Sequence, residues 1–485
     1  MQTPSRVLKL LCVGNLLWLG LCDQSSAETL PDALALAYAS NPSLQAQRAQ
    51  LRATDEEYAQ AESGYRPSIS VSESYTYSYL EVPPASQTTT NGTGGAIAVT
   101  QPLYTGGRVA RAIDVAHADI LAGRAALRHT ETQILLNVIQ VYVEVRRDRE
   151  ALHIGDSEIE MLSNQLDQTN AQFAAGDATL TDIAQAEARL AEARAQHAAT
   201  QADLEAATAS YAAVVGQAPG DLAPQPPLTA MLPATVDAAF DAADAANPDL
   251  AQARMSELTA SARVAEAKAL NRPTLGLTGS VGYTTGAVVV DGQLLNPGVN
   301  GGPFSNLAPN ATIMATATIP IYTGGLNSSQ IRQAAEQDGA ARLSVEVVRR
   351  QVTQSVAVAW DHLLGERQSI TADEERVKAD TLARDGVREE QKAGFRTVLD
   401  VLNSEHEVAA SMLALVNAQY DEYLATASVL ATIGSLDADE LLPTEHHYDP
   451  AANYRKVTHA MVWTPWARAI DSIDRLGAPQ PPGPN

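Results

Sequence analysis

Cysteine is almost absent from this chain of 485 residues, and its two cysteines, Cys12 and Cys22, lie within the first 27. Those residues have the pattern of a secretory signal, in which Arg6 and Lys9 precede a short apolar run and small residues follow it. The run is too short to span a bilayer as a helix. We therefore predict that residues 1–27 are removed, which leaves no disulfide and no thiol. Lipidation at Cys22 is the alternative, disfavoured by the bulky leucine before it.

Basic residues are scarce beside acidic ones. The chain has 33 Lys and Arg against 57 Asp and Glu, a net charge of −24. This charge argues against a nucleic-acid partner and indicates either simple solubility or an acidic lumen that favours cations. Nucleotide-binding loops, metal-ligand spacings and nucleophile elbows are also lacking. We predict no enzymatic activity, no cofactor and no metal site; the one histidine pair, His446-His447, lies in a polar tail.

Proline is missing from two long stretches, 103–218 and 321–442, although the chain holds 25 prolines. Both stretches are rich in strong helix formers. A helix from Gly107 to Gly176 would be on the order of 100 Å long. In the run after Gly176, larger and small residues share a heptad seam. Such helices are too long for a globular core and indicate a coiled coil or a tube.

Several short motifs of the sequence occur twice. PLYTGG at 102–107 returns as PIYTGG at 320–325, 218 positions later, while the Asn-Pro and Arg-Pro pairs at 41–42 and 66–67 return after 206. A fixed spacing with one local insertion indicates a tandem duplication. The predicted organisation is a signal peptide, a first repeat, an extended Pro-rich linker, a second repeat and a C-terminal segment, at 1–27, 28–216, 217–233, 234–434 and 435–485.

Strands are predicted after Pro67 and after Pro273, where apolar and small polar residues alternate. In a soluble sandwich the apolar face would be core, whereas in an outer-membrane barrel it would meet lipid; periodicity alone does not separate the two. The signal sequence, the strand length and the tyrosines favour the barrel. The Gly-, Pro- and Asn-rich segments 82–95 and 286–310 are predicted to be the outer loops of two hairpins, with a turn at Asn91-Gly92-Thr93.

Two hairpins supply only four strands. Such a sheet in lipid would leave two unpaired edges, and each unsatisfied polar group there costs several kcal/mol. Several chains must therefore close one barrel, and three chains would provide twelve strands.

In this order, the duplicated motifs and AGFRTVLDVLNSE at 393–405 resemble the TolC family of outer-membrane channel-tunnel proteins over nearly all of the mature chain. The resemblance implies a mainly α homotrimer with a twelve-stranded β-barrel in the outer membrane, continued by a long α-helical coiled-coil barrel through the periplasm. It places the barrel–helix junctions at Pro67, Pro102, Gly106, Gly107, Pro273, Pro320, Gly324 and Gly325.

The resemblance also assigns roles to the tips of the helical hairpins. Asp400 matches an aspartate that rings the periplasmic entrance, and Asn403 replaces a second one. Arg396 and Asp182 match residues of a latch that closes the entrance, whereas Gln391 replaces a gating tyrosine. From the sequence alone, Asp182 and Asp400 are equally well explained as helix caps. The positions for docking a periplasmic adaptor are Gly176, Asp177, Gly394 and Phe395.

The function that these features predict is a passive exit duct, recruited by a periplasmic adaptor and an inner-membrane ABC or RND transporter. The tail TEHHYDPAANYRKV resembles members paired with type I protein secretion, so secretion of unfolded polypeptides is the first prediction and multidrug efflux a close second. A structural coiled-coil surface protein without a pore is the distant alternative. The sequence does not specify the cargo, the pump or the resting state of the entrance.

Overall fold

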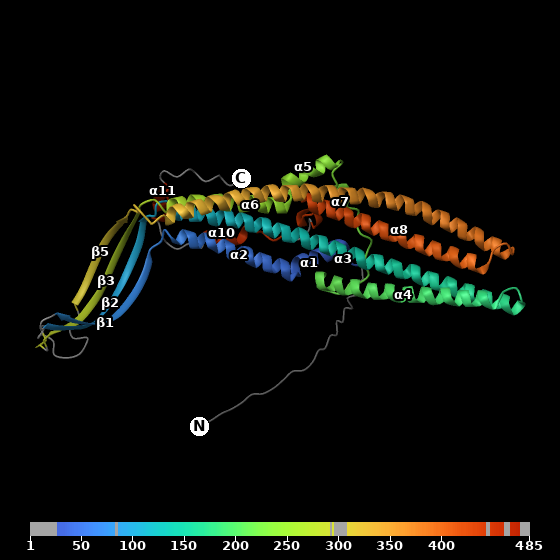
Figure 1. Ribbon diagram of the computed structural model, residues 1–485, viewed down its shortest axis with the longest axis horizontal. Coiled ribbons are helices and arrows are strands. Elements are labelled where there is room, and N and C mark those ends of the chain that lie inside the picture. Colours follow the sequence, from blue (N-terminus) through green and yellow to red (C-terminus); the bar gives the residue numbers. More distant parts are fainter. Residues whose placement is uncertain are drawn as a thin grey trace, which may run out of the picture.

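The computed structural model describes residues 27–82, 86–291, 293–294, 308–442, 447–459 and 466–475. The predicted signal peptide, apart from Ala27, lies outside these residues. The molecule is elongated: the sheet lies at one end, and two long helical hairpins run to the other (Figure 1).

The two halves of the chain have the same order of elements. The first half contains α1 (Leu30–Ser40), α2 (Pro42–Ser63), β1 (Ser68–Val82), β2 (Ser86–Tyr104), α3 (Arg108–Ala175) and α4 (Leu180–Val215). The second contains α5 (Val236–Ala246), α6 (Pro248–Ala269), β3 (Thr274–Val290), β5 (Ala308–Thr318), α7 (Leu326–Lys392) and α8 (Val398–Ile433). Helices α3 and α7 begin 218 positions apart, and α2 and α6 begin 206 apart, which are the two spacings of the sequence motifs.

Shorter elements complete the chain. A 3-10 turn, η1 (Thr229–Met231), interrupts the otherwise non-helical linker, and β4 (Gln293–Leu294) pairs with the end of β3. The C-terminal segment contains α9 (Ala438–Leu441), α10 (Ala452–His459) and α11 (Ala467–Asp474).

Helix boundaries follow from local chemistry. Asn41 and Asn247 cap α2 and α6, since their side chains accept hydrogen bonds from backbone N–H groups of the first turn, and a proline follows each of them. Gly176 and Gly394 end the outward helices of the two hairpins with φ of 87° and 83°, a conformation that glycine adopts without strain.

The sheet is antiparallel, and its long strands follow the order β1-β2-β3-β5, so β1 and β5 are the edges among the long strands described. Its register places apolar residues in rows across all four strands. One row is Ile69, Val99, Gly279 and Ile313, and the next is Val71, Ile97, Val281 and Ala311. The row between them is Ser70, Ala98, Ser280 and Thr312. One face is therefore apolar and the other small and polar, as the alternation predicted.

The predicted loop at 82–95 is wrong, because β2 already begins at Ser86 and Asn91 pairs with Tyr77 inside the ladder. Its glycines have a different purpose. A Cβ on Gly95 would lie 2.6 Å from the ring of Tyr283 on β3, so a larger residue here would have to displace that ring. The second predicted loop, 286–310, is also too long, since β3 continues to Val290 and β5 starts at Ala308; residues 295–307 lie outside the described part.

The main core lies midway along the helices, where α1 and α5 lie beside the long hairpins (Figure 1). The fully buried Tyr142 donates to the carbonyl oxygens of Glu28 and Ala223, and the buried Tyr211 donates to the Glu28 carboxylate. The linker is thus tied to α3, and Glu28 is tied to both α3 and α4. In the described part of the chain, every helix is too short or too polar to cross a bilayer.

The C-caps of α4 and α8 provide a matched test of packing, since Gly216 and Gly434 occupy equivalent positions with φ of 98° and 79°. A Cβ on Gly434 would lie 2.3 Å from the carbonyl oxygen of Ala246, whereas one on Gly216 meets only the Ser40 hydroxyl at 3.5 Å. Both alanine substitutions introduce about 1–2 kcal/mol of backbone strain. We expect Gly434→Ala to cost a further ~1–3 kcal/mol, as overpacking does.

Thermal unfolding followed by circular dichroism measures the difference. We expect the Tm of Gly434→Ala to fall clearly below that of Gly216→Ala. Equal Tm values would mean that the backbone between α5 and α6 shifts to accommodate the added methyl group without loss of stability.

Candidate functional site

The tips of the two helical hairpins lie at the end of the molecule opposite the sheet (Figure 1). Nothing lies within 4 Å of a Cβ built on Gly176 or Gly394, so glycine is required there for its positive φ and not for space. Asp177 is exposed, and Phe395 presents 82% of its surface to solvent. The four residues predicted to dock an adaptor therefore all lie on exposed turns; their docking role stays a prediction.

Between the two tips lies a polar cavity of about 1140 Å³. Asp177 and Asp182 line it from the outer hairpin, α3–α4, and Gln391, Gly394 and Arg396 line it from the inner hairpin, α7–α8. Five of the predicted residues, from two segments more than 200 positions apart, thus share one cavity. Gly176, Phe395, Asp400 and Asn403 are not part of its lining.

Asp400 and Asp182 both form capping boxes. Oδ2 of Asp400 accepts hydrogen bonds from the Thr397 N–H at 2.9 Å and from the Thr397 hydroxyl at 2.8 Å. Asp182 accepts the same pair of bonds from Thr179, both at 2.8 Å. The bonds from Thr397, and then the charge of Arg396, lower the pKa of Asp400. Of the two roles that the sequence left open, capping is therefore present in the fold, and gating stays a prediction.

Arg396 pairs within its own hairpin. Its Nε lies 2.8 Å from Oε2 of Glu390, and this pair raises the pKa of Arg396. Because both side chains are about half exposed, the pair is weak and free to exchange partners. The role of Arg396 in a latch that closes the entrance stays a prediction.

Asn403 links the two hairpins. Its Oδ1 accepts a hydrogen bond of 2.9 Å from Nη2 of Arg189 on α4. One turn further on, Nδ1 of His406 lies 3.3 Å from Oε1 of Glu158 on α3. The two polar links flank a small apolar cluster of Leu162, Ala186, Leu190, Ala193, Val398 and Leu402. The sequence analysis missed Arg189, Glu158 and His406, because no local motif announces a contact between residues more than 200 positions apart.

A buried carboxylate lies behind the tip. Glu405 on α8 is 2% exposed, and Nη2 of Arg388 on α7 lies 2.5 Å from its Oε1. Burial raises the pKa of Glu405, against the opposing attraction of Arg388. The same guanidinium lies 3.6 Å from the sulfur of Met161 on α3, so Arg388 contacts both hairpins. Sequence reasoning did not single out this pair either.

At the other end of the helices, the two barrel–helix junctions adopt the same backbone. Gly106, Gly107, Gly324 and Gly325 all have positive φ, between 65° and 85°. Pro67 and Pro273 directly precede β1 and β3, Pro102 lies at a register shift in β2, and Pro320 follows β5. The predicted junction residues thus lie where strands and helices meet.

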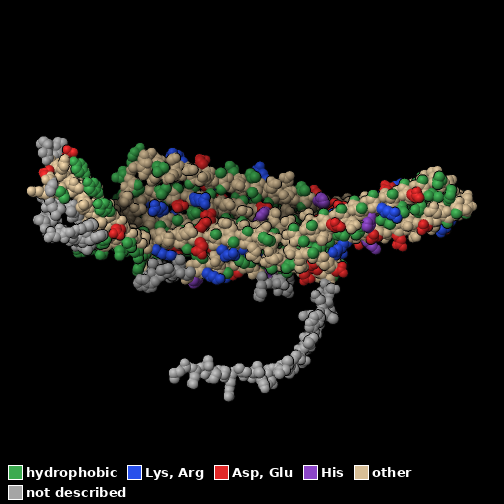
Figure 2. All heavy atoms as spheres, turned by 90° about the horizontal axis from the view of Figure 1, so that it is seen from below, with side chains coloured by type: hydrophobic (Ala, Val, Ile, Leu, Met, Phe, Trp, Pro, Cys, Tyr) green, Lys and Arg blue, Asp and Glu red, His purple; other side chains and the backbone are tan. Residues whose placement is uncertain are grey.

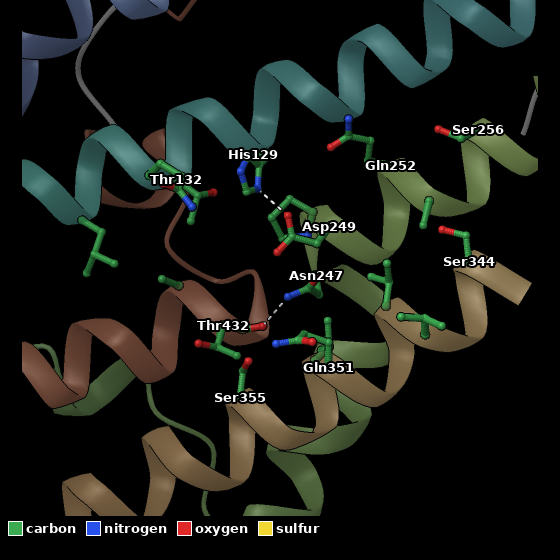
Figure 3. Close-up of a pocket in the computed structure, with 18 of the residues that line it drawn as sticks. His129, Thr132, Asn247, Asp249, Gln252, Ser256, Ser344, Gln351, Ser355 and Thr432 are labelled. Carbon is green, nitrogen blue, oxygen red and sulfur yellow. Dashed lines mark hydrogen bonds and ion pairs between the residues drawn. The ribbon is translucent and has the colours of Figure 1, made fainter. Parts of the chain in front are cut away.

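A second cavity, of about 860 Å³, lies among α3, α6, α7 and α8 (Figure 3). His129 of α3 faces Asp249 of α6 with Nδ1 2.5 Å from Oδ1, and this bond raises the pKa of His129 despite its partial burial. Asn247 donates to the carbonyl oxygen of Thr432 at 2.7 Å, which joins the start of α6 to the end of α8. The described residues contain no cluster of three or more His, Cys, Asp or Glu able to hold a metal.

The capping box of α8 gives a direct test at the tip. Thr397→Val keeps the shape of the side chain but removes the hydroxyl that bonds Asp400, which should destabilise this helix start by about 1 kcal/mol. We expect faster cleavage by protease at the inner tip, with Thr397→Ser close to wild type because it retains the hydroxyl. Identical cleavage rates for the valine and serine variants would contradict this account of the cap.

Comparisons with known proteins agree with this architecture. The model of the family described as outer membrane efflux protein matches residues 33–217 and 239–435, the two halves of the duplication. The outer membrane efflux protein BepC of Brucella suis is 34% identical over 89% of this chain and 91% of its own. The outer membrane protein TolC of Escherichia coli is 26% identical over 87% and 85%. Two further relatives, each 24% identical, carry names that describe protease secretion.

Solved structures show the same fold. The outer-membrane channel OprN superimposes with a TM-score of 0.71 over 84% of this chain and 90% of its own, at 20% identity. The family model matches both repeats, and the superposition covers most of both chains in one fold. The chain therefore belongs to the outer membrane efflux protein family, and the predicted resemblance to TolC-type channel-tunnel proteins is confirmed.

Proposed function

We propose that three copies of this chain form an outer-membrane exit duct that a periplasmic adaptor couples to an inner-membrane transporter. The observation that carries the proposal is the sheet, whose four long strands have an apolar face and two free edges. The proposal includes no catalytic step and no cofactor.

The apolar face of the sheet is exposed in a single copy. Ile69, Val71, Tyr75 and Ile313 show between 65% and 83% of their surface, and hydrophobic side chains gather on the strands in Figure 2. A water-soluble sheet would not expose such a face. Facing hydrocarbon, it is favourable, while the small polar rows would line a water-filled bore.

The free edges require further copies of the chain. Backbone groups at the outer sides of β1 and β5 have no partner strand among the described residues. Closing β5 of one copy against β1 of the next satisfies them, and three copies give a ring of twelve long strands.

The helical region supports the same assembly. Along α7, the apolar side chains of Leu343, Val347, Val358 and Leu382 are each more than 60% exposed. Figure 2 shows that the helical body is hollowed along one face, next to the sheet. We infer that the next copy covers the exposed stripe of α7 and that three hollow faces enclose the bore.

At the far end, the tips would converge on one axis. Three Asp400 carboxylates would then form an acidic ring that attracts cations. Gly176, Asp177, Gly394 and Phe395, on the turns of the outer and inner hairpins, would meet the adaptor, and the transporter would be of the ABC or RND type.

We favour small molecules as the cargo, because the relative of 34% identity is named as an efflux protein. Type I protein secretion is the second candidate. It is supported by the tail motif and by the relatives named for protease secretion. Deleting the gene and measuring both drug susceptibility and secreted protein would separate the two cargoes.

Conductance in a planar bilayer tests the duct. We expect purified wild-type protein to conduct, and a trivalent cation on the periplasmic side to block it. Asp400→Ala should raise the blocking concentration by on the order of tenfold or more, because three charges are lost together. Thr397→Val, which weakens the cap but keeps the charge, should leave the block intact.

The pH dependence of this block follows from the lowered pKa of Asp400. A carboxyl with a lowered pKa stays ionised at neutral pH and loses its charge only in acid, so the block should be full at neutral pH and be lost only on acidification. Equal block in wild type and Asp400→Ala would refute the ring, and absence of any conductance would refute the duct.

The link between hairpins predicts a gating phenotype. Arg189→Ala removes the hydrogen bond to Asn403, which frees the inner hairpin to move away from α4. We expect a higher open probability in single-channel recordings than for wild type. Arg194→Ala, an exposed arginine one turn along the same helix, is the control and should behave like wild type. An unchanged open probability in Arg189→Ala would contradict a role of this bond in closure.

A further inference from the structure

The C-terminal segment runs back along the molecule, from the middle of the helices to the sheet end (Figure 1). Near the middle, the backbone N–H of Tyr448 donates to the hydroxyl of Tyr38 on α1, and the guanidinium of Arg48 lies over both rings at 4.4 and 4.9 Å. The described residues 447–459 and 466–475 therefore form a packed layer and not a free tail.

Helix α10 packs on α2. The ring of Tyr454 meets that of Tyr58 edge to face, with centroids 5.3 Å apart. Nδ2 of Asn453 donates at 3.0 Å to Asp55, a carboxylate with no exposed surface on α2. These contacts hold the segment along α2 on its way towards the strands.

Helix α11 ends in the first barrel–helix junction. Asp474 is fully buried, and its Oδ1 accepts hydrogen bonds from the N–H of Thr105 at 2.7 Å and from the N–H of Gly107 at 3.1 Å. Its Oδ2 accepts from the hydroxyls of Thr105 at 2.7 Å and Tyr65 at 3.2 Å. Four donors thus surround one carboxylate.

This carboxylate binds the chain just before α3, whose first turn is also capped locally: the Thr105 hydroxyl accepts a hydrogen bond from the Val109 N–H at 3.2 Å. Gly107 is the N-cap of the 68-residue helix α3, and having no side chain it cannot cap the helix itself. A negative charge at this position satisfies free N–H groups and complements the helix dipole. The carboxylate that binds the Gly107 N–H comes from 367 positions away along the chain.

The second junction lacks these features. Thr323, Gly324 and Gly325 repeat the backbone of Thr105–Gly107 but are exposed, and Asn271 stands where the first repeat has Tyr65. There, the amide of Asn327 bonds to Asn271 and to the Leu270 carbonyl oxygen instead. Only the first junction is built to receive a carboxylate.

We infer that the C-terminal segment is a strap, fastened by Asp474, that fixes the first β-hairpin against α3. Trp466 and Ile470 complete the fastening: the indole N–H donates to Gln101 of β2 at 3.1 Å, and Ile470 packs among Tyr65, Val109 and Ile113. The strap holds the angle between membrane strands and periplasmic helices. Its position at the membrane boundary rests on the proposed function.

Thiol reactivity tests the strap locally. With Cys12 and Cys22 both in the predicted signal peptide, Ile470→Cys would place a single thiol in the mature chain, at a side chain now 6% exposed. In the full trimer, adding Asp474→Ala should speed maleimide labelling of this thiol by at least about tenfold, because the strap end detaches. Asp474→Asn should have a smaller effect, since its amide oxygen still accepts from both N–H groups.

Two controls and one replacement variant make the result specific. Asp241→Ala, at an exposed carboxylate on α5, should leave labelling unchanged. A separate thiol from Leu190→Cys, in the apolar cluster near the tips, should label at the same rate with and without Asp474→Ala. If Asp474→Ala does not assemble, Tyr65→Phe replaces it, since it removes one donor to Asp474 without changing shape.

The strap is supported if Asp474→Ala speeds labelling at position 470 and not at position 190. An unchanged rate in Asp474→Ala or Tyr65→Phe, or an equal rise at position 190, would overturn it. The labelling result does not depend on transport. If the wild-type trimer conducts but Asp474→Ala leaves the labelling rate unchanged, the strap is refuted and the duct is not.

Discussion

A strand edge in hydrocarbon must find a partner, and the architecture of this protein follows from that constraint. One chain builds four long strands with an apolar face, too few to close on themselves. The chain therefore depends on copies of itself, and the same assembly that satisfies the edges would cover the exposed stripe of α7 and enclose a bore. Joining the copies edge to edge would thus form both the barrel in the membrane and the helical tube beneath it.

The duplication gives both halves of the chain the same geometry, and the two halves differ at the junctions between strands and helices. Equivalent turns at Gly176 and Gly394, and equivalent capping boxes at Asp182 and Asp400, show how far the halves agree. The halves diverge at their barrel–helix junctions. The first junction receives a carboxylate from the C-terminal segment, while the second uses an asparagine pair and stays exposed.

Much of the fold could be predicted from the sequence, because its signals are local. Proline-free runs predicted the long helices, and two-residue alternation predicted strands whose register places Val71, Ile97 and Val281 in one row. The loop at 82–95 was predicted wrongly for an equally physical reason. Glycine usually marks a turn, but Gly95 lies in a strand, where the ring of Tyr283 packs closely over it.

The candidate site was predictable only in part. The hairpin turns and the caps follow from neighbouring residues, so the positions of Gly394 and Asp400 were foreseen. The hydrogen bond between Arg189 and Asn403 spans 214 positions, and that between Gly107 and Asp474 spans 367. Neither pair has a local pattern, since each depends on how separate helices meet.

Closure between copies can be measured directly by disulfide cross-linking across the proposed seam. The mature chain is predicted to lack cysteine, so Val71→Cys on β1 can be combined with Ala311→Cys, Ile313→Cys or Ala315→Cys on β5, three adjacent registers of one edge. The account predicts that at least one pair, oxidised in membranes, yields a covalent species of three chains that reductant returns to one. A product that stays at the size of a single chain in every register, from protein that remains monomeric in water without detergent, would contradict it.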